Sequence, residues 1–247
     1  MTRQSVTIAV LPLGAHEQHG PHLPFETDAL IAGAVAERLA KAAAPGIGLE
    51  VLPVETVGYS IEHMNVDGTQ TLAFDEAINR WIGIAGECAE RGIRRLMLLN
   101  AHGGNSPLLT IVATEARVRF NMLVVATSWT RFGVPNGAIS PDDKAYDIHA
   151  GDIETSVMLA LEPELVRQEA IRDFPSSQQE FAARFKHLRA YGPHAFGWKM
   201  SDLNPDGAAG KASQASAIKG EALLAHAVGG LCELLTDMAQ FDPDDLH

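Results

Sequence analysis

Acidic and histidine side chains cluster near the start of the chain, in the stretch LPLGAHEQHGPHLPFETDAL at residues 11–30. The prolines and the glycine in this stretch exclude one continuous helix, and so many polar groups would make a poor core. Carboxylates and imidazoles are ligands for divalent metal ions, so the pattern predicts a functional site. Its members are Glu17, His19, His22, Glu26 and Asp28.

Two later segments, NAHGGNS and YDIHAGDIETS, supply more groups of the same kind. A hydrolytic site with two metals needs carboxylates, neutral imidazoles and one carboxylate that bridges ions about 3.5–4 Å apart. A lone loop histidine is more often a hydrogen-bonded surface residue than a ligand, so the prediction depends on the combination. We predict the ligand set Glu17, His19, Asp28, His102 and Glu154, and leave out His16, His22, Glu26 and Asp152.

The elements that must position these residues alternate along the chain. Apolar, β-branched runs (VTIAVLPL, LEVLPV, RRLMLLN and NMLVVATS) alternate with helix-period segments at residues 28–44, 75–91, 107–120 and 151–161. This order predicts an α/β fold of three layers, with a mostly parallel sheet and helices on both faces. Residues 163–205 are less regular and predict an excursion over the core, and a last helix at 212–238 is expected to pack back onto the sheet.

The polar segments follow the strands, where ligands gather in open α/β sheets. GAHEQHGPH follows the first strand, NAHGGNS follows the third, and YDIHAGDIETS opens a later helix. Gly103 and Gly104 are expected to permit a tight turn, Pro107 suits a first helical turn, and Asn105 is expected to cap that helix and steady the turn at His102. The three loops are therefore predicted to converge on one edge of the sheet.

Composition limits the classes of protein to which the chain can belong. Its 247 residues are 46% hydrophobic, which suits one soluble domain over residues 1–247. A formal charge of −12 argues against a nucleic-acid partner, because no basic face opposes that field. Cys88 and Cys232 lie in apolar surroundings, which suits a reducing compartment. No leader or membrane span is evident, so we expect a cytoplasmic protein.

Several of these segments together resemble the creatininase family of metal-dependent amidohydrolases. The resemblance is carried by PLGAHEQHGPHLPFETDALIA, GYSIEHMNVDGTQTL, LLNAHGGNS, HAGDIETSVMLAL and, more weakly, DLNPDGAAGKASQASAIKG, so it spans nearly the whole chain. It implies a creatininase-like fold and two divalent ions, zinc, manganese or iron. It also implies a homo-oligomer, with a hexamer as the family's usual form.

The resemblance implies a role for each member of the ligand set. Glu17, Asp28 and His102 would hold one ion. His19, Asp28 and Glu154 would hold the other, so that Asp28 bridges the two.

The resemblance also identifies His149 as the residue that moves protons. Two departures distinguish the chain from the creatinine enzyme itself: Gly104 replaces a metal-binding glutamate, and Ile148 replaces a catalytic glutamate. Creatinine is therefore not the expected substrate.

Four further features complete the predicted pocket. Trp129 is expected to form one wall, and the Gly103–Gly104 turn to offer a backbone N–H to the oxyanion. Glu62 and His63 either line the pocket or seal a subunit contact.

The predicted function is hydrolysis of a C–N amide bond in a small molecule, a cyclic amide or a formamide, by metal-activated water. Alternatives within the family are a formylamino-pyrimidine nucleotide deformylase and a peptidase for a modified peptide. A two-metal phosphoesterase and a non-catalytic binding protein represent other classes. A phosphate-bearing substrate would need a basic cluster, and only Arg131, Lys144 and Lys199 are candidates near the motifs. This scarcity weakens the nucleotide alternative but leaves it open.

Overall fold

A four-stranded parallel sheet forms the centre of the computed structural model, which describes residues 6–245. The strand order is β2-β1-β3-β4, and all three pairings are parallel. The four strands are β1 (Val6–Leu13), β2 (Ile47–Val51), β3 (Arg95–Asn100) and β4 (Leu123–Ser128). The predicted parallel sheet is confirmed.

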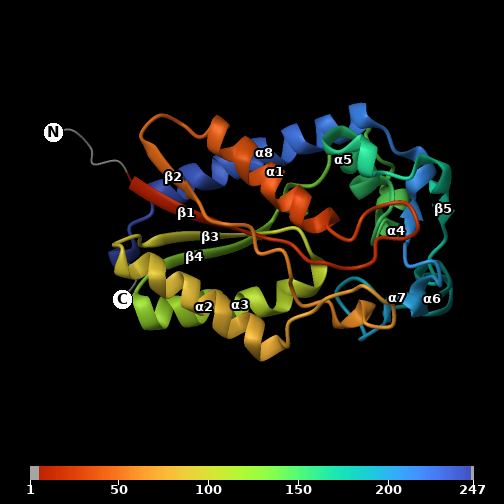
Figure 1. Cartoon of the computed structure of the whole chain (residues 1–247), viewed down its shortest axis with the longest axis horizontal. Helices are drawn as coiled ribbons and strands as arrows, with labels where there is room; N and C mark the ends of the chain where they lie inside the picture. The colour runs from red at the N-terminus through yellow and green to blue at the C-terminus, as the bar shows by residue number, and fades with distance from the viewer. Residues whose placement is uncertain (1–5, 246–247) are drawn as a thin grey trace.

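Helices cover both faces of this sheet and give the three layers that the sequence predicts (Figure 1). One face carries α1 (Thr27–Ala42), α5 (Asp152–Leu161) and α8 (Ala217–Gln240), and the other carries α2 (Phe74–Glu90) and α3 (Ser106–Phe120). Side chains of β1 alternate between the layers, because successive residues of a strand point to opposite faces. Ile8 and Val10 pack beneath α1 and α8, whereas Ala9 and Leu11 pack against α2 and α3.

Short elements gather beyond the carboxyl ends of the strands. A two-stranded antiparallel sheet pairs β5 (Asp173–Phe174) with β6 (Gly210–Lys211). The helices are α4 (Pro141–Tyr146), α6 (Gln178–Arg184) and α7 (Met200–Leu203), and the 3-10 turns are η1 (Ile61–His63), η2 (Gly103–Asn105), η3 (Trp129–Phe132), η4 (Pro163–Leu165), η5 (Gln168–Ala170) and η6 (Ala212–Gln214). A last 3-10 turn, η7 (Pro243–Asp245), lies instead at the amino end of the sheet, where Asp244 pairs with Arg94 before β3. The irregular segment at residues 163–205 is thus a series of short elements.

The last helix differs from its predicted start at residue 212. Residues 212–214 form the separate turn η6, and α8 begins after Ser216, whose hydroxyl accepts a hydrogen bond from the backbone N–H of Lys219. By length and composition α8 also resembles a membrane span, with 39% of its apolar window buried. Its buried side chains pack into the layer that α1 and α5 share, as those of a core helix do.

Candidate metal centre

The predicted ligands meet at the point where the strand order reverses. The chain leaves β1 toward β2 on one side of the sheet, and leaves β3 toward β4 on the other. In open α/β sheets such a reversal opens a crevice beyond the carboxyl ends of the strands. The loops after β1 and β3 and the first turns of α1 and α5 all end there.

Glu17 lies at the centre of this group and is completely buried. Its Oε1 is 3.1 Å from Nδ1 of His102 and 3.4 Å from Nε2 of His63, yet neither carboxylate oxygen has a partner in hydrogen-bond geometry. Burial favours protonation, but His102 and His63 outweigh it and hold the pKa of Glu17 well below its usual value. A buried carboxylate with no donor requires a nearby positive charge.

His19 and His102 share one hydrogen-bonding arrangement. Nδ1 of His19 donates to the backbone carbonyl of Glu17 at 2.9 Å, and its Nε2 lies 3.3 Å from Oδ1 of Asp28. Nε2 of His102 donates to the carbonyl of Tyr59 at 2.9 Å, and its Nδ1 faces Glu17 and Asp28. Metal-ligating histidines have this form, since one ring N–H is fixed by an acceptor and the other nitrogen faces the ion.

The neighbouring carboxylates also raise the pKa values of these two histidines. Burial alone would lower the pKa of His19, but Asp28 and then Glu154 outweigh it and raise the pKa to about 9. The pKa of His102 lies well above its usual value because Glu17 and Asp28 outweigh the same effect of burial. The carboxylates therefore bind positive charge at this point, either as protons or as cations.

Asp28 stands between the two histidines on the first turn of α1. Its Oδ1 faces His19, and its Oδ2 lies 3.3 Å from Nδ1 of His102 without making a hydrogen bond. The side chain is almost fully buried. The two oxygens thus face two different imidazoles, which is the arrangement that a bridging carboxylate needs.

Glu154 approaches from the first turn of α5. Its Oε2 accepts a hydrogen bond from the backbone N–H of Ala150 at 2.6 Å, and burial raises its pKa to about 7. One ligand atom from each of His19, Asp28 and Glu154 lies within 4.8 Å of the others. Ala150 itself has a φ of 49°, in the left-handed region that a non-glycine residue seldom adopts.

Asp147 fixes the start of α5 and with it the position of Glu154. Its two carboxylate oxygens accept hydrogen bonds from the backbone N–H groups of Asp152 and Ile153, both at 2.9 Å. Gly151 leaves room for this carboxylate, because a Cβ there would lie 1.6 Å from Oδ1 of Asp147. The sequence around Asp147 does not predict this role, because its acceptor role depends on the fold around α5.

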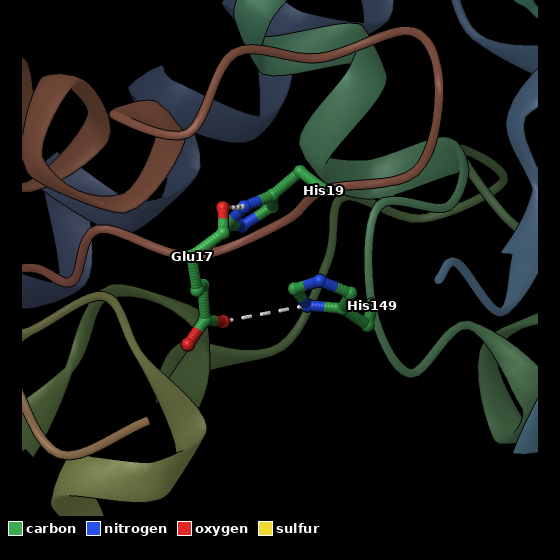
Figure 2. Close-up of side chains that lie close together, drawn as sticks. All are labelled: Glu17, His19 and His149. Atoms are coloured by element: carbon green, nitrogen blue, oxygen red, sulfur yellow. Dashed lines mark hydrogen bonds and ion pairs between the residues drawn. The ribbon is translucent and has the colours of Figure 1, made fainter. Parts of the chain in front are cut away.

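His149 lies beside the group and faces Glu17 (Figure 2). Its Nε2 donates to the carbonyl of Gln18 at 2.7 Å, while its Nδ1 lies 3.8 Å from Oε1 of Glu17. Burial, followed by the charge of His19, holds the pKa of His149 well below its usual value, so the ring is neutral. Its ligand atom also lies within 4.8 Å of atoms from Glu17 and His19.

A cleft of about 490 Å³ opens beside these residues. His149 and Glu154 line it together with Gly103 and Trp129. Ile148 contributes an apolar side chain to the same lining. A cavity of this size suits a small molecule.

Gly104, Glu62 and His63 lie outside the lining of this cleft and next to Glu17 or His102. Oε1 of Glu62 is 3.6 Å from Nε2 of His102, and Glu62 forms a further potential metal group with Glu17 and His102. The ring of His63 lies 4.5 Å from that of His149.

One predicted local role, the cap at Asn105, needs correction. Asn105 does not cap α3 through its side chain, which instead donates to the carbonyl of Gly14 and accepts from the N–H of Tyr59. Gly103 and Gly104 do form a tight turn, the 3-10 turn η2, and they form it without positive φ angles. Gly104 is needed for space, since a Cβ there would lie 2.4 Å from the carbonyl oxygen of Tyr59.

Comparison with known proteins identifies relatives that are hydrolases. The family model for creatininase, described as creatinine amidohydrolase, matches residues 1–235. A mycofactocin precursor peptide peptidase of Mycobacterium tuberculosis is 36% identical over 66% of this chain, and the match spans 62% of that peptidase. A creatinine amidohydrolase of Pseudomonas putida is 29% identical over 96% of this chain and 90% of its own length. A 2-amino-5-formylamino-6-ribosylaminopyrimidin-4(3H)-one 5'-monophosphate deformylase of Methanobrevibacter smithii is 26% identical over 79% of this chain and 86% of its own.

Solved structures of similar fold include two metal forms. A manganese creatininase superposes with a TM-score of 0.77 at 27% identity and covers 97% of this chain and 93% of its own. A zinc–zinc form of a mutant creatininase superposes with a TM-score of 0.78 at 27% identity, covering 96% and 92%.

Proposed function

The chain belongs to the creatininase family of hydrolases, and from this premise we propose that it is an amidohydrolase that holds two divalent metal ions. One observation carries the proposal: His19 and His102 each donate one ring N–H to a backbone carbonyl and turn the other nitrogen toward buried carboxylates. Both oxygens of Glu17 and Oδ2 of Asp28 lack hydrogen-bond partners there. The donor set of oxygens and imidazoles fits divalent cations.

We assign the residues to two sites that share Asp28. Glu17 and His102 would hold one ion, and His19 and Glu154 the other. Zinc and manganese are the proposed metals, since solved relatives exist in both forms. Glu62 is a further potential ligand of the first ion because it approaches His102.

The chain's own residues orient the substrate and move a proton. When bound, the ions would supply a water of lowered pKa and polarise the amide carbonyl. Because Nε2–H of His149 is fixed by the carbonyl of Gln18, Nδ1 of the neutral ring carries no proton. It would first accept a proton from the attacking water and then pass that proton to the leaving nitrogen. Trp129, which is almost fully buried, forms a rigid wall of the cleft. Gly103 exposes backbone to the cleft for the developing oxyanion.

The proposed substrate is a small amide other than creatinine. Ile148 lines the cleft immediately before His149 and brings no carboxylate to the reaction. A cyclic amide or a formamide fits a cleft of about 490 Å³. A cytoplasmic location is also proposed, on the cysteines and the N-terminal sequence, and a homo-oligomeric, hexameric assembly is proposed on the resemblance alone.

Metal analysis and a substrate panel test the proposal together. Protein purified without chelator is expected to contain two equivalents of zinc or manganese per chain and to hydrolyse a member of a panel of cyclic amides, formamides and short modified peptides. Activity should disappear on chelation and return with metal. A phosphate ester serves as the control for the phosphoesterase alternative. Trace metal, no uptake on reconstitution and no amide turnover would refute the proposal.

A further inference from the structure

Two basic side chains line the cleft without an acidic partner. Arg131 lies on η3 and Lys144 on α4, and both are exposed at the lining. Within residues 6–245, neither side chain makes an ion pair or a hydrogen bond. Eight other basic residues of this range form ion pairs with carboxylates: Arg38, Arg80, Arg91, Arg94, Arg119, Arg172, Lys211 and Lys219.

The carboxylates next to Lys144 are occupied by other groups. Asp143 pairs with Lys211 at 2.6 Å and accepts from the hydroxyl of Ser140. Asp147 also lines the cleft, but both its oxygens accept backbone N–H groups of α5. Lys144 therefore keeps its charge uncompensated at the cleft.

The two cations border one region of the cleft. A Cβ on Gly133 would lie 3.9 Å from Nζ of Lys144, so the ammonium group reaches back to the segment that carries Arg131. His149 and Glu154 line the same cleft. A molecule bound in the cleft thus meets the proposed metal centre and the two cations together.

The charge of this pair is opposite in sign to that of the whole chain. A chain with a formal charge of −12 repels anions, so two unpaired cations in a cleft create a local site at which an anion is attracted. The guanidinium fork of an arginine matches the oxygens of a carboxylate or a phosphate, and a lysine adds a point charge.

We propose that Arg131 and Lys144 form an anion subsite and that the amide hydrolysed by this protein is a small acidic one, bearing a carboxylate or a phosphate group. The inference rests on the proposed function, because it names the substrate class of the same cleft. The group recognised is a carboxylate, with two oxygens, or a phosphate, with three terminal oxygens. It belongs to a ligand small enough for a cleft of about 490 Å³.

Three small amides test the subsite by isothermal titration calorimetry at fixed ionic strength. Succinamide is neutral, succinamate carries a carboxylate and carbamoylmethylphosphonate carries a phosphonate. The metal-loaded wild-type protein is expected to bind an anionic amide roughly 10-fold more tightly than succinamide. The double variant Arg131→Gln/Lys144→Gln should lose this preference. The matched control Lys41→Gln/Lys186→Gln makes the same change of charge away from the cleft and should keep it.

Each outcome decides the question. Loss of affinity for only one anionic amide identifies that group as the one recognised, and loss for both shows that the subsite takes either. If the wild type and the cleft double variant prefer anionic amides over succinamide equally, the anions bind the metals directly. If the wild type shows no such preference, the two cations are only solvated. Either result overturns the proposal. Titrations of chelated protein test the anion subsite separately from the proposed metal-dependent function. A preference for anionic amides that persists without metal supports the subsite, even where metal analysis refutes the proposed function.

Discussion

Asp28 is the residue on which the proposed centre depends most, because its two oxygens face two different histidines. We expect Asp28→Ala to lose both ions, since neither site would keep its shared ligand. His19→Ala should lose the second ion more than the first, because His19 belongs to one site only. Elemental analysis of the purified variants measures both effects.

Glu26→Ala is the control for this pair. Glu26 is an exposed carboxylate two residues before Asp28, and its contact is an ion pair of 3.7 Å with His16. This variant should retain two ions per chain. Two ions in Asp28→Ala would disprove the bridge.

His149 and Glu154 are predicted to have separable roles. His149→Ala should keep both ions and lose roughly 100- to 10,000-fold in rate, the usual contribution of a general acid or base. Glu154→Ala should instead lose the second ion, and excess metal should restore part of its activity. Metal content and kcat of the two variants decide between the roles. Equal metal loss would make His149 a ligand, in keeping with its position near Glu17 and His19.

Ile148 predicts poor activity on creatinine. An apolar side chain at this lining position brings neither a charge nor a proton to the reaction. We expect a turnover number below the usual enzyme range of about 1–1000 per second, measured by release of creatine. Turnover within that range would show that Ile148 does not exclude the reaction.

At the scale of elements, the turn η2 contains a matched pair of glycines. A Cβ on Gly104 would lie 2.4 Å from both the carbonyl oxygen of Tyr59 and Nε2 of His102, whereas a Cβ on Gly103 meets nothing within 4 Å. Gly104→Ala should therefore destabilise the fold by about 1–3 kcal/mol, the usual cost of overpacking, and weaken metal binding through His102. Gly103→Ala should do neither. Urea unfolding and metal content measure the difference, and equal behaviour of the two variants would contradict this role of Gly104.

The turn η2 and its neighbours show which features of the site can be predicted from the sequence. The convergence of the loops after β1 and β3 was predictable, because parallel strands end at one edge of a sheet and apolar runs identify the strands. The bonds of Asn105 were not, since its partners Gly14 and Tyr59 lie far away in the chain and depend on the folded arrangement. A polar residue before a helix predicts a cap from local context alone, and here long-range partners replace the cap.

The short helices and turns could not be predicted from the sequence either. Helices such as α6 and α7 contain too few residues to show a hydrophobic period, so residues 163–205 read as irregular. Glu62 and His63 were identified as residues of interest, but their place among the carboxylates depends on how η1 packs against the loop of Glu17. The ligand roles themselves stay predictions.

At the scale of the whole molecule, the proposed ligands come from separate elements. Glu17 and His19 follow β1, His102 follows β3, Asp28 lies on α1 and Glu154 on α5. Ions held by these residues would join the loops at the end of the sheet to helices of the layer above it (Figure 1). The single domain and the oligomer remain predictions; light scattering of the purified chain, expected to give a mass well above 26.5 kDa, tests the latter.

Chelation should therefore lower the stability of the entire protein. Removing the ions leaves the buried Glu17 and Asp28 and the half-buried Glu154 near one another with only protons to compensate their charge. A ligand at 100 times its Kd stabilises a fold by about 2.7 kcal/mol, which corresponds to roughly 5–10 °C in Tm for a chain of this length. We expect differential scanning calorimetry to show at least this loss of Tm on chelation of the wild type. Asp28→Ala, which should hold no ion, is expected to show no change with chelator. An equal decrease in both proteins would attribute the effect to the chelator itself, and an unchanged wild-type Tm would show that ions do not join these elements.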